Sequence, residues 1–494
     1  MTIKSKNIIN KLVIELQLPG SENQRDENSD NVKVAVLDGI YSFDRNFSAS
    51  FSDQIYRTEQ VQINISIDRD KRSNIAAEVV RQLKEHFLQQ GAPRLQFQND
   101  RKPGSLTEVT RLTERQKNEE LLLYFLLHGF SPWWADSPDM MKVTDTLLAE
   151  SSPDFWELKL RPLLVNKPVV VERIAKQFTD ESYLRILFLA TGDESAANSA
   201  GRFVGEVENF LKERPDPFSY GFTEKIIAIL KIRLLNYLLE KKEKFTRSSE
   251  SQLIEVATAV LLDNVAEVTS YEWTEFIKGT TEKKRQKWAN IAKKKIKART
   301  GKPETNITEI DKKEELKTIA ASPVEGVYNV SQAGLVLLHP FMSRLFEKTG
   351  YLKDGLFRSD EVRERAVCLL HYLSAGESEY PEPELLLPMH LCSWPAGIPV
   401  NRFLTLSKYE KEECSRLLKS AIEHWQALKN TTPDGLRVNF LMRNGRLKKG
   451  EFGWTLHVEH KTHDVLLNKL PWGISLIKFK WMSEHLTIDW KNSS

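Results

Sequence analysis

The sequence predicts a mainly α protein of the α+β class, with helical-hairpin domains, a small N-terminal α/β region and short C-terminal β-strands. Apolar residues recur at helical spacing through most of the chain, whereas alternation of apolar and polar residues is confined to short segments. Prolines between the short helices are typical of tight turns between stacked hairpins. The chain has 494 residues, enough for about two to four domains at ~150 residues each.

Residues 1–115 form the predicted N-terminal α/β region. Asn10–Gln17 and Val32–Leu37 are strand candidates. Val61–Ile67 alternates strictly between apolar and polar residues, as a half-buried strand does. A helix is expected to begin at Ser73, because the apolar residues that follow have nearly helical spacing: Ile75, Val79, Leu83 and Phe87.

Residues 116–245 form the predicted helical domain. Glu120–Leu127 is apolar nearly all round, so we expect a buried helix that stops at Gly129. Pro162 is expected to end or kink the helix that contains it. The other helices are expected at Met140–Glu150, Phe155–Leu164, Val169–Phe178, Ser182–Leu189, Phe203–Lys212 and Thr223–Lys244.

Residues 246–320 form a predicted basic helical linker or tether, with an embedded helix at Ser251–Val268. Thr281–Lys302 holds ten Lys or Arg residues against one Glu, too polar to form a core alone. The simplest interpretation is a solvated arm, and the alternative is binding to an anionic partner such as an acidic protein lumen. Nucleic acid is disfavoured because Trp288 is the only aromatic residue for stacking. The basic residues singled out are Lys283, Lys284, Arg285, Lys287, Lys293, Lys294 and Lys295.

Residues 321–494 form the predicted C-terminal helical domain with short β elements. Two strands, Trp454–Val458 and Leu486–Trp490, are expected to pair antiparallel. Thr432–Gly435 has the composition of a turn, in which Pro433 fixes φ and Gly435 supplies freedom, with Asp434 between them. The segment Leu466–Ile474 is expected to end a helix and leave through the corner Pro471-Trp472-Gly473. Helices are expected at Pro340–Thr349, Glu361–Ser374, Leu385–Ser393 and Lys408–Leu428.

Histidines provide the best candidate for a metal site. His457, His460 and His463 are spaced three apart, and neutral imidazole is a common zinc ligand. A strand would direct His457 and His460 to opposite faces, so surface or capping histidines are the favoured interpretation. His339 and His424 are interpreted as core or capping residues near helix ends. No phosphate-binding glycine motif or nucleophile elbow is present, and the sequence predicts no catalytic residue, no metal and no cofactor.

Tryptophans crowd the end of the chain, where they could form one aromatic core or a partner surface. The core is favoured, because a Trp side chain buries a large area. The five residues are Trp425, Trp454, Trp472, Trp481 and Trp490.

The cysteine content favours a reducing compartment during synthesis. The three cysteines, Cys368, Cys392 and Cys414, have no spacing typical of a disulfide framework or zinc site. No apolar stretch approaches the ~18 residues of a membrane helix, and no signal segment is evident. We therefore expect a cytoplasmic protein without a membrane span.

Several motifs together resemble the tape-measure family of contractile injection systems. They are A-G-L-V-L-L-H-P-F (Ala333–Phe341), R-E-R-A-V-C-L-L-H-Y-L (Arg363–Leu373), H-W-Q-A-L-K-N-T-T-P-D-G-L-R (His424–Arg437), G-W-T-L-H-V-E (Gly453–Glu459) and L-L-N-K-L-P-W-G-I (Leu466–Ile474), with further similarity at Leu122–Ala135 and Val169–Phe178. The residues carried over as candidate interaction or structural motif positions are His339, Pro340, Trp425, Pro433, Asp434, Gly435, Trp454, Pro471, Trp472 and Gly473.

The resemblance implies a non-enzymatic structural or assembly component of a phage-tail-like particle, which helps to set tube and sheath length. It implies contacts with tube subunits and with baseplate or hub proteins, in the cytoplasm during assembly. Whether the protein stays inside the assembled particle is left open by the sequence. Two alternatives stay open at this point: an assembly adaptor or chaperone that docks tube or baseplate proteins, and a metal-dependent hydrolase that uses the three C-terminal histidines. The sequence does not determine the oligomeric state or the copy number.

Overall fold

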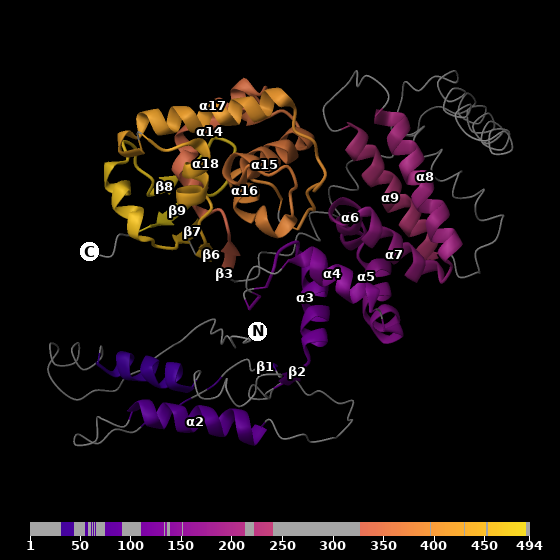
Figure 1. Ribbon diagram of the computed structural model, residues 1–494, viewed down its shortest axis with the longest axis horizontal. Coiled ribbons are helices and arrows are strands. Elements are labelled where there is room, and N and C mark those ends of the chain that lie inside the picture. Colours follow the sequence, from indigo (N-terminus) through magenta and orange to yellow (C-terminus); the bar gives the residue numbers. More distant parts are fainter. Residues whose placement is uncertain are drawn as a thin grey trace. The chain divides into compact units, whose positions relative to one another are not determined.

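The computed structural model describes residues 31–43, 55–57, 61, 63, 65, 75–90, 110–240 and 327–490, with short gaps at 133, 136–138, 151, 213–221, 396, 429 and 451–452. The chain divides into two compact units, Met1–Glu120 and Leu121–Ser494. Residues from both units form helices and short strands (Figure 1). The prediction of a mainly helical protein with some β-structure is confirmed. The predicted strand Asn10–Gln17 and the predicted linker 246–320 lie outside the described residues.

In the first unit, the residues that the structure describes before α3 form two helices and a short strand pair. Helix 31–43 packs against α2 (Ile75–Gln90) around a small core of Phe43, Val79 and Leu83. The helices approach closely at Gly39, where an added Cβ would lie 2.8 Å from the Ala76 carbonyl oxygen. Strand β1 (Ile55–Arg57) pairs antiparallel with β2 (Thr110–Leu112).

Two strand predictions in this unit are wrong. Val32–Leu37 is helical, because residues three and four apart, such as Val36 and Ile40, pack toward α2, and this packing outweighs the strand preference of valine. Val61, Ile63 and Ile65 do pack against the small core, as alternation requires, but they are not in a strand.

The helical part of the second unit, residues 121–240, is here called the helical subdomain. Its helices bury one continuous apolar core that includes Leu122, Ile174 and Leu234. The predicted helices are confirmed, and α8 starts earlier than expected. The elements are α3 (Glu114–His128), α4 (Met140–Ala149), the π-helix η2 (Phe155–Leu160), α5 (Arg161–Asn166), α6 (Pro168–Gln177), α7 (Asp180–Thr191), α8 (Glu194–Lys212) and α9 (Phe222–Glu240).

Pro162 does not end its helix. The π-helix η2 passes directly into α5, and Pro162 lies in the first turn of α5. The Arg161 N–H bonds to the Trp156 carbonyl in the wider π register. A proline is tolerated here because the missing N–H falls where the helix changes register.

Residues 327–490 are here called the C-terminal subdomain. Helices α14 and α15 both pack against α17 (Figure 1). The four helices predicted here are confirmed, to within one or two residues at most ends. The helical elements are η3 (Ala333–Leu338), α14 (His339–Lys348), α15 (Asp360–Ala375), η4 (Glu382–Glu384), α16 (Leu386–Leu391), α17 (Lys408–His424), η5 (Gln426–Leu428), α18 (Pro433–Leu436), η6 (Arg437–Leu441) and η7 (Thr462–Lys469).

The C-terminal subdomain also contains a five-stranded sheet in the order β3-β6-β7-β9-β8. The strands are β3 (Val327–Val330), β6 (Gly445–Gly450), β7 (Gly453–Val458), β8 (Leu476–Ile477) and β9 (Leu486–Asp489), and a separate pair is formed by β4 (Leu352–Lys353) and β5 (Leu356–Phe357). The two predicted strands do pair, but β7 and β9 run parallel, so the antiparallel prediction is wrong. The 27 residues between Val458 and Leu486 include η7 and β8, and this long crossover returns the chain to the same end of the sheet.

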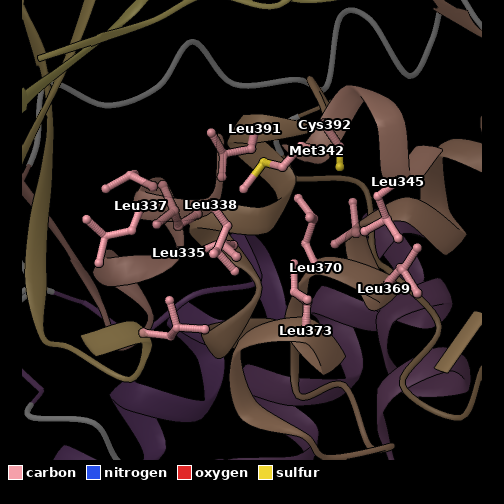
Figure 2. Close-up of a cluster of buried hydrophobic side chains, with 14 of the residues drawn as sticks. Leu335, Leu337, Leu338, Met342, Leu345, Leu369, Leu370, Leu373, Leu391 and Cys392 are labelled. Carbon is pink, nitrogen blue, oxygen red and sulfur yellow. The ribbon is translucent and has the colours of Figure 1, made fainter. Parts of the chain in front are cut away.

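Alternating burial in this sheet places one face on the core and leaves the other exposed. Leu447 of β6 is buried, whereas its neighbours Arg446 and Lys448 are exposed. The buried face meets leucines of η3, α14, α15 and α16, some of which Figure 2 labels. The three cysteines are free and buried in this core, and burial raises the pKa of each thiol. Ionised thiolate is therefore disfavoured at all three positions.

Candidate functional site

Motif residues from three distant segments meet around Phe341. The Phe341 ring lies edge-on to Trp472, with 5.2 Å between ring centroids, and 6.0 Å from His424. The Trp472 indole N–H donates to the Leu337 carbonyl oxygen at 2.9 Å. Pro340, Pro471 and Gly473 are exposed beside this contact. We call the group Leu337, Phe341, His424 and Trp472 the Phe341 corner.

The two histidines near this corner bond to helix carbonyls. His339 is the first residue of α14, and its Nδ1 lies 3.0 Å from the Val336 carbonyl oxygen. His424 is the last residue of α17, and its Nδ1 lies 2.7 Å from the Ser420 carbonyl oxygen. Both positions agree with the capping interpretation, since carbonyls at a helix end need donors.

Trp425 lies at the centre of a second contact. Its side chain is 2% exposed, its indole N–H donates to the Leu466 carbonyl oxygen at 3.2 Å, and its ring lies 4.9 Å from that of Phe440. Behind Phe440, the backbone comes so close to Gly334 that an added Cβ would lie 1.7 Å from the Phe440 carbonyl oxygen. Phe440 therefore connects the Gly334 motif with Trp425, and the Trp425 indole joins the Leu466 motif through its hydrogen bond.

The segment Pro433-Asp434-Gly435 starts a helix, so its prediction as a turn is wrong. Thr432 caps the first turn of α18 by accepting the Gly435 N–H at 3.0 Å, and Pro433 occupies a first-turn position that needs no N–H. The Asp434 carboxylate accepts a bond from Arg437 at 2.8 Å. Arg437 also donates to the Leu373 carbonyl oxygen at 3.1 Å, near the end of α15. Through Asp434 and Arg437 the segment is thus joined to the end of α15.

Trp454, on β7, packs between the sheet and α16. Its ring lies 5.1 Å from His390 and 6.0 Å from Tyr328. Trp425 is buried in the same core, and Trp454, Trp472, Trp481 and Trp490 are partly buried against it. These positions agree with the favoured interpretation of the tryptophans as an aromatic core.

The three histidines of the metal hypothesis have separate partners. His457 Nδ1 lies 2.8 Å from an Asp489 carboxylate oxygen. His463 Nε2 lies 2.7 Å from the Asn439 carbonyl oxygen. His460 lies 3.8 Å from Asp464. Among the described residues, no three His, Cys, Asp or Glu side chains are grouped as metal ligands.

Arg443 and Asp464 form a buried ion pair that the sequence did not indicate. The two side chains are 0% and 3% exposed and lie 3.0 Å apart. Trp490 donates to the same carboxylate at 3.0 Å. Burial opposes ionisation of Asp464, but hydrogen bonds from the Lys461 N–H and Trp490 and the charge of Arg443 outweigh it, so the pKa falls below its ordinary value. The one available signal was an arginine directly after the apolar run Phe440–Met442.

Burial of His390 is expected to make the C-terminal subdomain sensitive to acid. Its Nε2 is buried without a hydrogen-bond partner. Burial lowers the pKa of His390 to about 4, with Lys449 adding to the effect and Glu484 opposing it. In the unfolded chain this residue is protonated near pH ~6.5. Its contribution to the stability of the fold is therefore complete above that pH and is lost as the pH falls toward 4.

We therefore predict that the free energy of unfolding falls less steeply with acid when His390 is replaced by Phe, which keeps an aromatic ring beside Trp454. The parent protein should lose up to about 3 kcal/mol between pH 6.5 and 4 through this residue, at ~1.4 kcal/mol per pKa unit. Urea unfolding at several pH values measures the effect. An equal pH slope in the parent and in H390F would contradict this assignment.

The polar atoms of the described motif residues thus form hydrogen bonds mainly within the subdomain, with backbone carbonyls and with one another. Outer edges such as Pro340, Pro471 and Gly473 remain accessible. The basic residues between 283 and 295 lie outside the described residues. Within the described ranges, every helix is too short or too polar to cross a membrane.

Comparisons with known proteins identify the family. No curated protein and no solved structure matches the chain significantly. The family model described as contractile injection system tape measure protein matches residues 6–490. This match extends over both compact units and all the motifs that meet around Phe341 and Trp425. The chain therefore belongs to the contractile injection system tape measure protein family.

Proposed function

We propose that the protein sets tube and sheath length, with the C-terminal subdomain as the docking part and residues 246–320 as the spacer. Membership of the tape-measure family gives it a structural role in the assembly of a phage-tail-like particle, and the match over residues 6–490 is the observation that carries the proposal. In this role the protein makes and breaks no covalent bond.

The docking role is supported by the hydrogen bonds of the motif residues, most of which are made within the subdomain. Side chains fixed by packing and by hydrogen bonds hold an accessible surface in one shape, which lowers the entropic cost of binding. The proposed partners are tube subunits and baseplate or hub proteins, met in the cytoplasm during assembly. The exposed residues beside the Phe341 corner, Pro340, Pro471 and Gly473, are the proposed contact points.

The spacer role is supported by length and charge. A fully helical chain of 494 residues would reach roughly 740 Å at ~1.5 Å per residue, whereas compact subdomains reach far less. A length-setting protein with folded ends therefore needs an extended middle. The ten basic residues of Thr281–Lys302 suit an acidic tube lumen, because opposite charge favours retention of the segment there.

Deletion of the 22 residues Thr281–Lys302 is expected to yield shorter tubes or tubes of scattered length. The mean length should fall by up to about 75 Å if the segment is fully extended, at ~3.4 Å per residue. Electron microscopy of purified particles measures the length distribution. An unchanged distribution would contradict the length-setting role.

A matched replacement separates reach from charge. A Gly/Ser segment of the same length keeps the reach but removes the basic residues. Parental tube length with this variant would assign the effect to reach alone, and short tubes would assign it to the charges.

An assembly adaptor is the second candidate, favoured by the compact folding of residues 327–490 around their own core. Such a protein would dock tube or baseplate components and leave before maturation. Quantitative mass spectrometry of mature particles distinguishes the two, because a length-setting protein remains inside and a departing chaperone does not.

A further inference from the structure

The helical and C-terminal subdomains have separate apolar cores. One core contains buried residues from Leu121 to Leu239, and the other contains buried residues from Tyr328 to Ile488. Among the described residues of the helical subdomain, Phe130 alone packs against the C-terminal core, edge-on to Tyr328 at 4.9 Å. Since little apolar surface joins the two, polar contacts must hold most of the interface.

The centre of this interface is a buried ion pair. Arg173 of α6 and Glu382 of η4 have side chains that are 0% and 1% exposed, and two bonds of 2.9 and 3.2 Å join them. Arg173 also donates to the carbonyl oxygens of Leu126 and Gly397. The guanidinium therefore crosslinks the segments on both sides of the interface.

Gln177, one turn further along α6, continues the polar contact. Its amide donates to the Val400 carbonyl oxygen at 2.8 Å and accepts the Glu382 N–H at 2.9 Å. The Arg402 N–H donates to the Lys176 carbonyl oxygen at 3.0 Å. We call this set, Arg173, Lys176 and Gln177 with Glu382, Val400 and Arg402, the α6 latch.

Such a contact is specific but separable. Burial raises the pKa of Glu382 to about 7, although the charge of Arg173 opposes the shift. Desolvation thus offsets much of the attraction between the two charges, and both regain water when the surfaces part. Removing only one partner is different, because the other is left buried without its counter-charge and without its hydrogen bonds. Arg173 would stay charged, whereas Glu382 would take up a proton.

The connectivity of the chain gives this separation a consequence. Helix α9 ends at Glu240 and β3 begins at Val327, so the two subdomains are joined covalently only through residues 241–326. A closed latch fixes the distance between the two ends of that segment. With the latch open, its 86 residues could span up to about 290 Å at ~3.4 Å per residue.

We propose that the α6 latch keeps the helical and C-terminal subdomains together in the free protein, and that its release allows the joining segment 241–326, which includes the proposed spacer 246–320, to extend. This proposal rests on the proposed length-setting function and adds the step at which the protein changes from a compact to an extended form. The protein is compact while the contacts of the α6 latch are formed, and it becomes extended once Arg173 separates from Glu382.

The test uses the full chain with fluorescent labels on cysteines placed at exposed Asn209 of α8 and Lys419 of α17. The three native thiols are buried and poorly ionised, so the introduced thiols react first. Energy transfer between the labels reports the distance between the subdomains. Arg173→Met should lower the closed-to-open ratio about a hundredfold or more.

Two variants provide controls. Lys225→Met removes a 3.0 Å ion pair across the same interface whose side chains are 53% and 60% exposed, so it should leave the transfer efficiency within error of the parent. Arg173→Met combined with Glu382→Met removes both buried charges and should restore most of the closed form. Circular dichroism shows whether each variant keeps its helices, and Glu382→Gln replaces Arg173→Met if that variant does not fold.

The latch is refuted if a folded Arg173→Met or Glu382→Gln variant keeps parental energy transfer, or if Lys225→Met lowers the transfer equally. If deletion of Thr281–Lys302 alters tube length but Arg173→Met does not change the energy transfer, the latch alone is rejected. Opening by Arg173→Met with unaltered tube length after the deletion would instead reject the length-setting function and keep the latch.

Discussion

Replacing Gly334 with alanine is expected to destabilise the C-terminal subdomain by about 3 kcal/mol, the upper range for overpacking a core. The added Cβ would lie 1.7 Å from the Phe440 carbonyl oxygen and 2.9 Å from the Leu441 Cα. Both contacts are with backbone, so no rotamer change relieves them. η3 and η6 would have to separate, which would disturb the packing of Trp425 on Phe440. Urea unfolding followed by tryptophan fluorescence measures the loss.

Gly473→Ala is the matched control in the same subdomain. Its added Cβ would meet no atom within 4 Å, so the unfolding midpoint should stay within error of the parent. Equal midpoints for G334A and G473A would show that the close approach at Gly334 does not constrain the core.

Arg443→Met is expected to cost about 3–5 kcal/mol, the usual range when one partner of a buried ion pair is removed. The side chain is 0% exposed and donates to the Asn439 carbonyl oxygen at 2.7 Å and the Glu459 carbonyl oxygen at 3.1 Å. Without it, Asp464 stays buried with its charge uncompensated. Thermal or urea unfolding of the full chain measures the change.

Arg416→Met provides the comparison for an exposed arginine. Its side chain is 55% exposed and pairs with Glu412 at 3.2 Å. It also pairs with the buried Glu413, which keeps Lys348 as a second cation at 3.2 Å. Because no carboxylate is left without a partner, the loss of Arg416 should cost about 1 kcal/mol. Arg443→Lys should fall between the two, because an ammonium keeps the charge but loses the forked donors. Similar costs for R443M and R416M would disprove the structural role of the buried pair.

Helices were predictable from the sequence because their signals are local. The apolar run of α3 and the spacing of apolar residues in α6 and α15 indicate helices without knowledge of any partner. The strand prediction for Val32–Leu37 failed because a short valine-rich segment fits either a strand or a buried helix face. Only packing against α2 decides between them.

Contacts between distant residues could not be predicted in this way. The parallel direction of β9 depends on the path of the crossover through η7 and β8, which no local pattern encodes. Thr432–Gly435 has turn composition, but the same residues are also a good helix cap. Arg173 and Glu382 are 209 residues apart, so neither could indicate the other. The motif positions were identified by resemblance, while their mutual packing became visible only in three dimensions.

The placement of β9 between β7 and β8 has a consequence for synthesis on the ribosome. A strand from the far end of the sequence completes the interior of the sheet, so the sheet cannot close until residue 489 has been translated and has left the exit tunnel. Helices α4–α9 depend on nearer contacts and are complete in sequence by Glu240. During translation the helical subdomain should thus fold first, as a nascent intermediate whose latch partner does not yet exist.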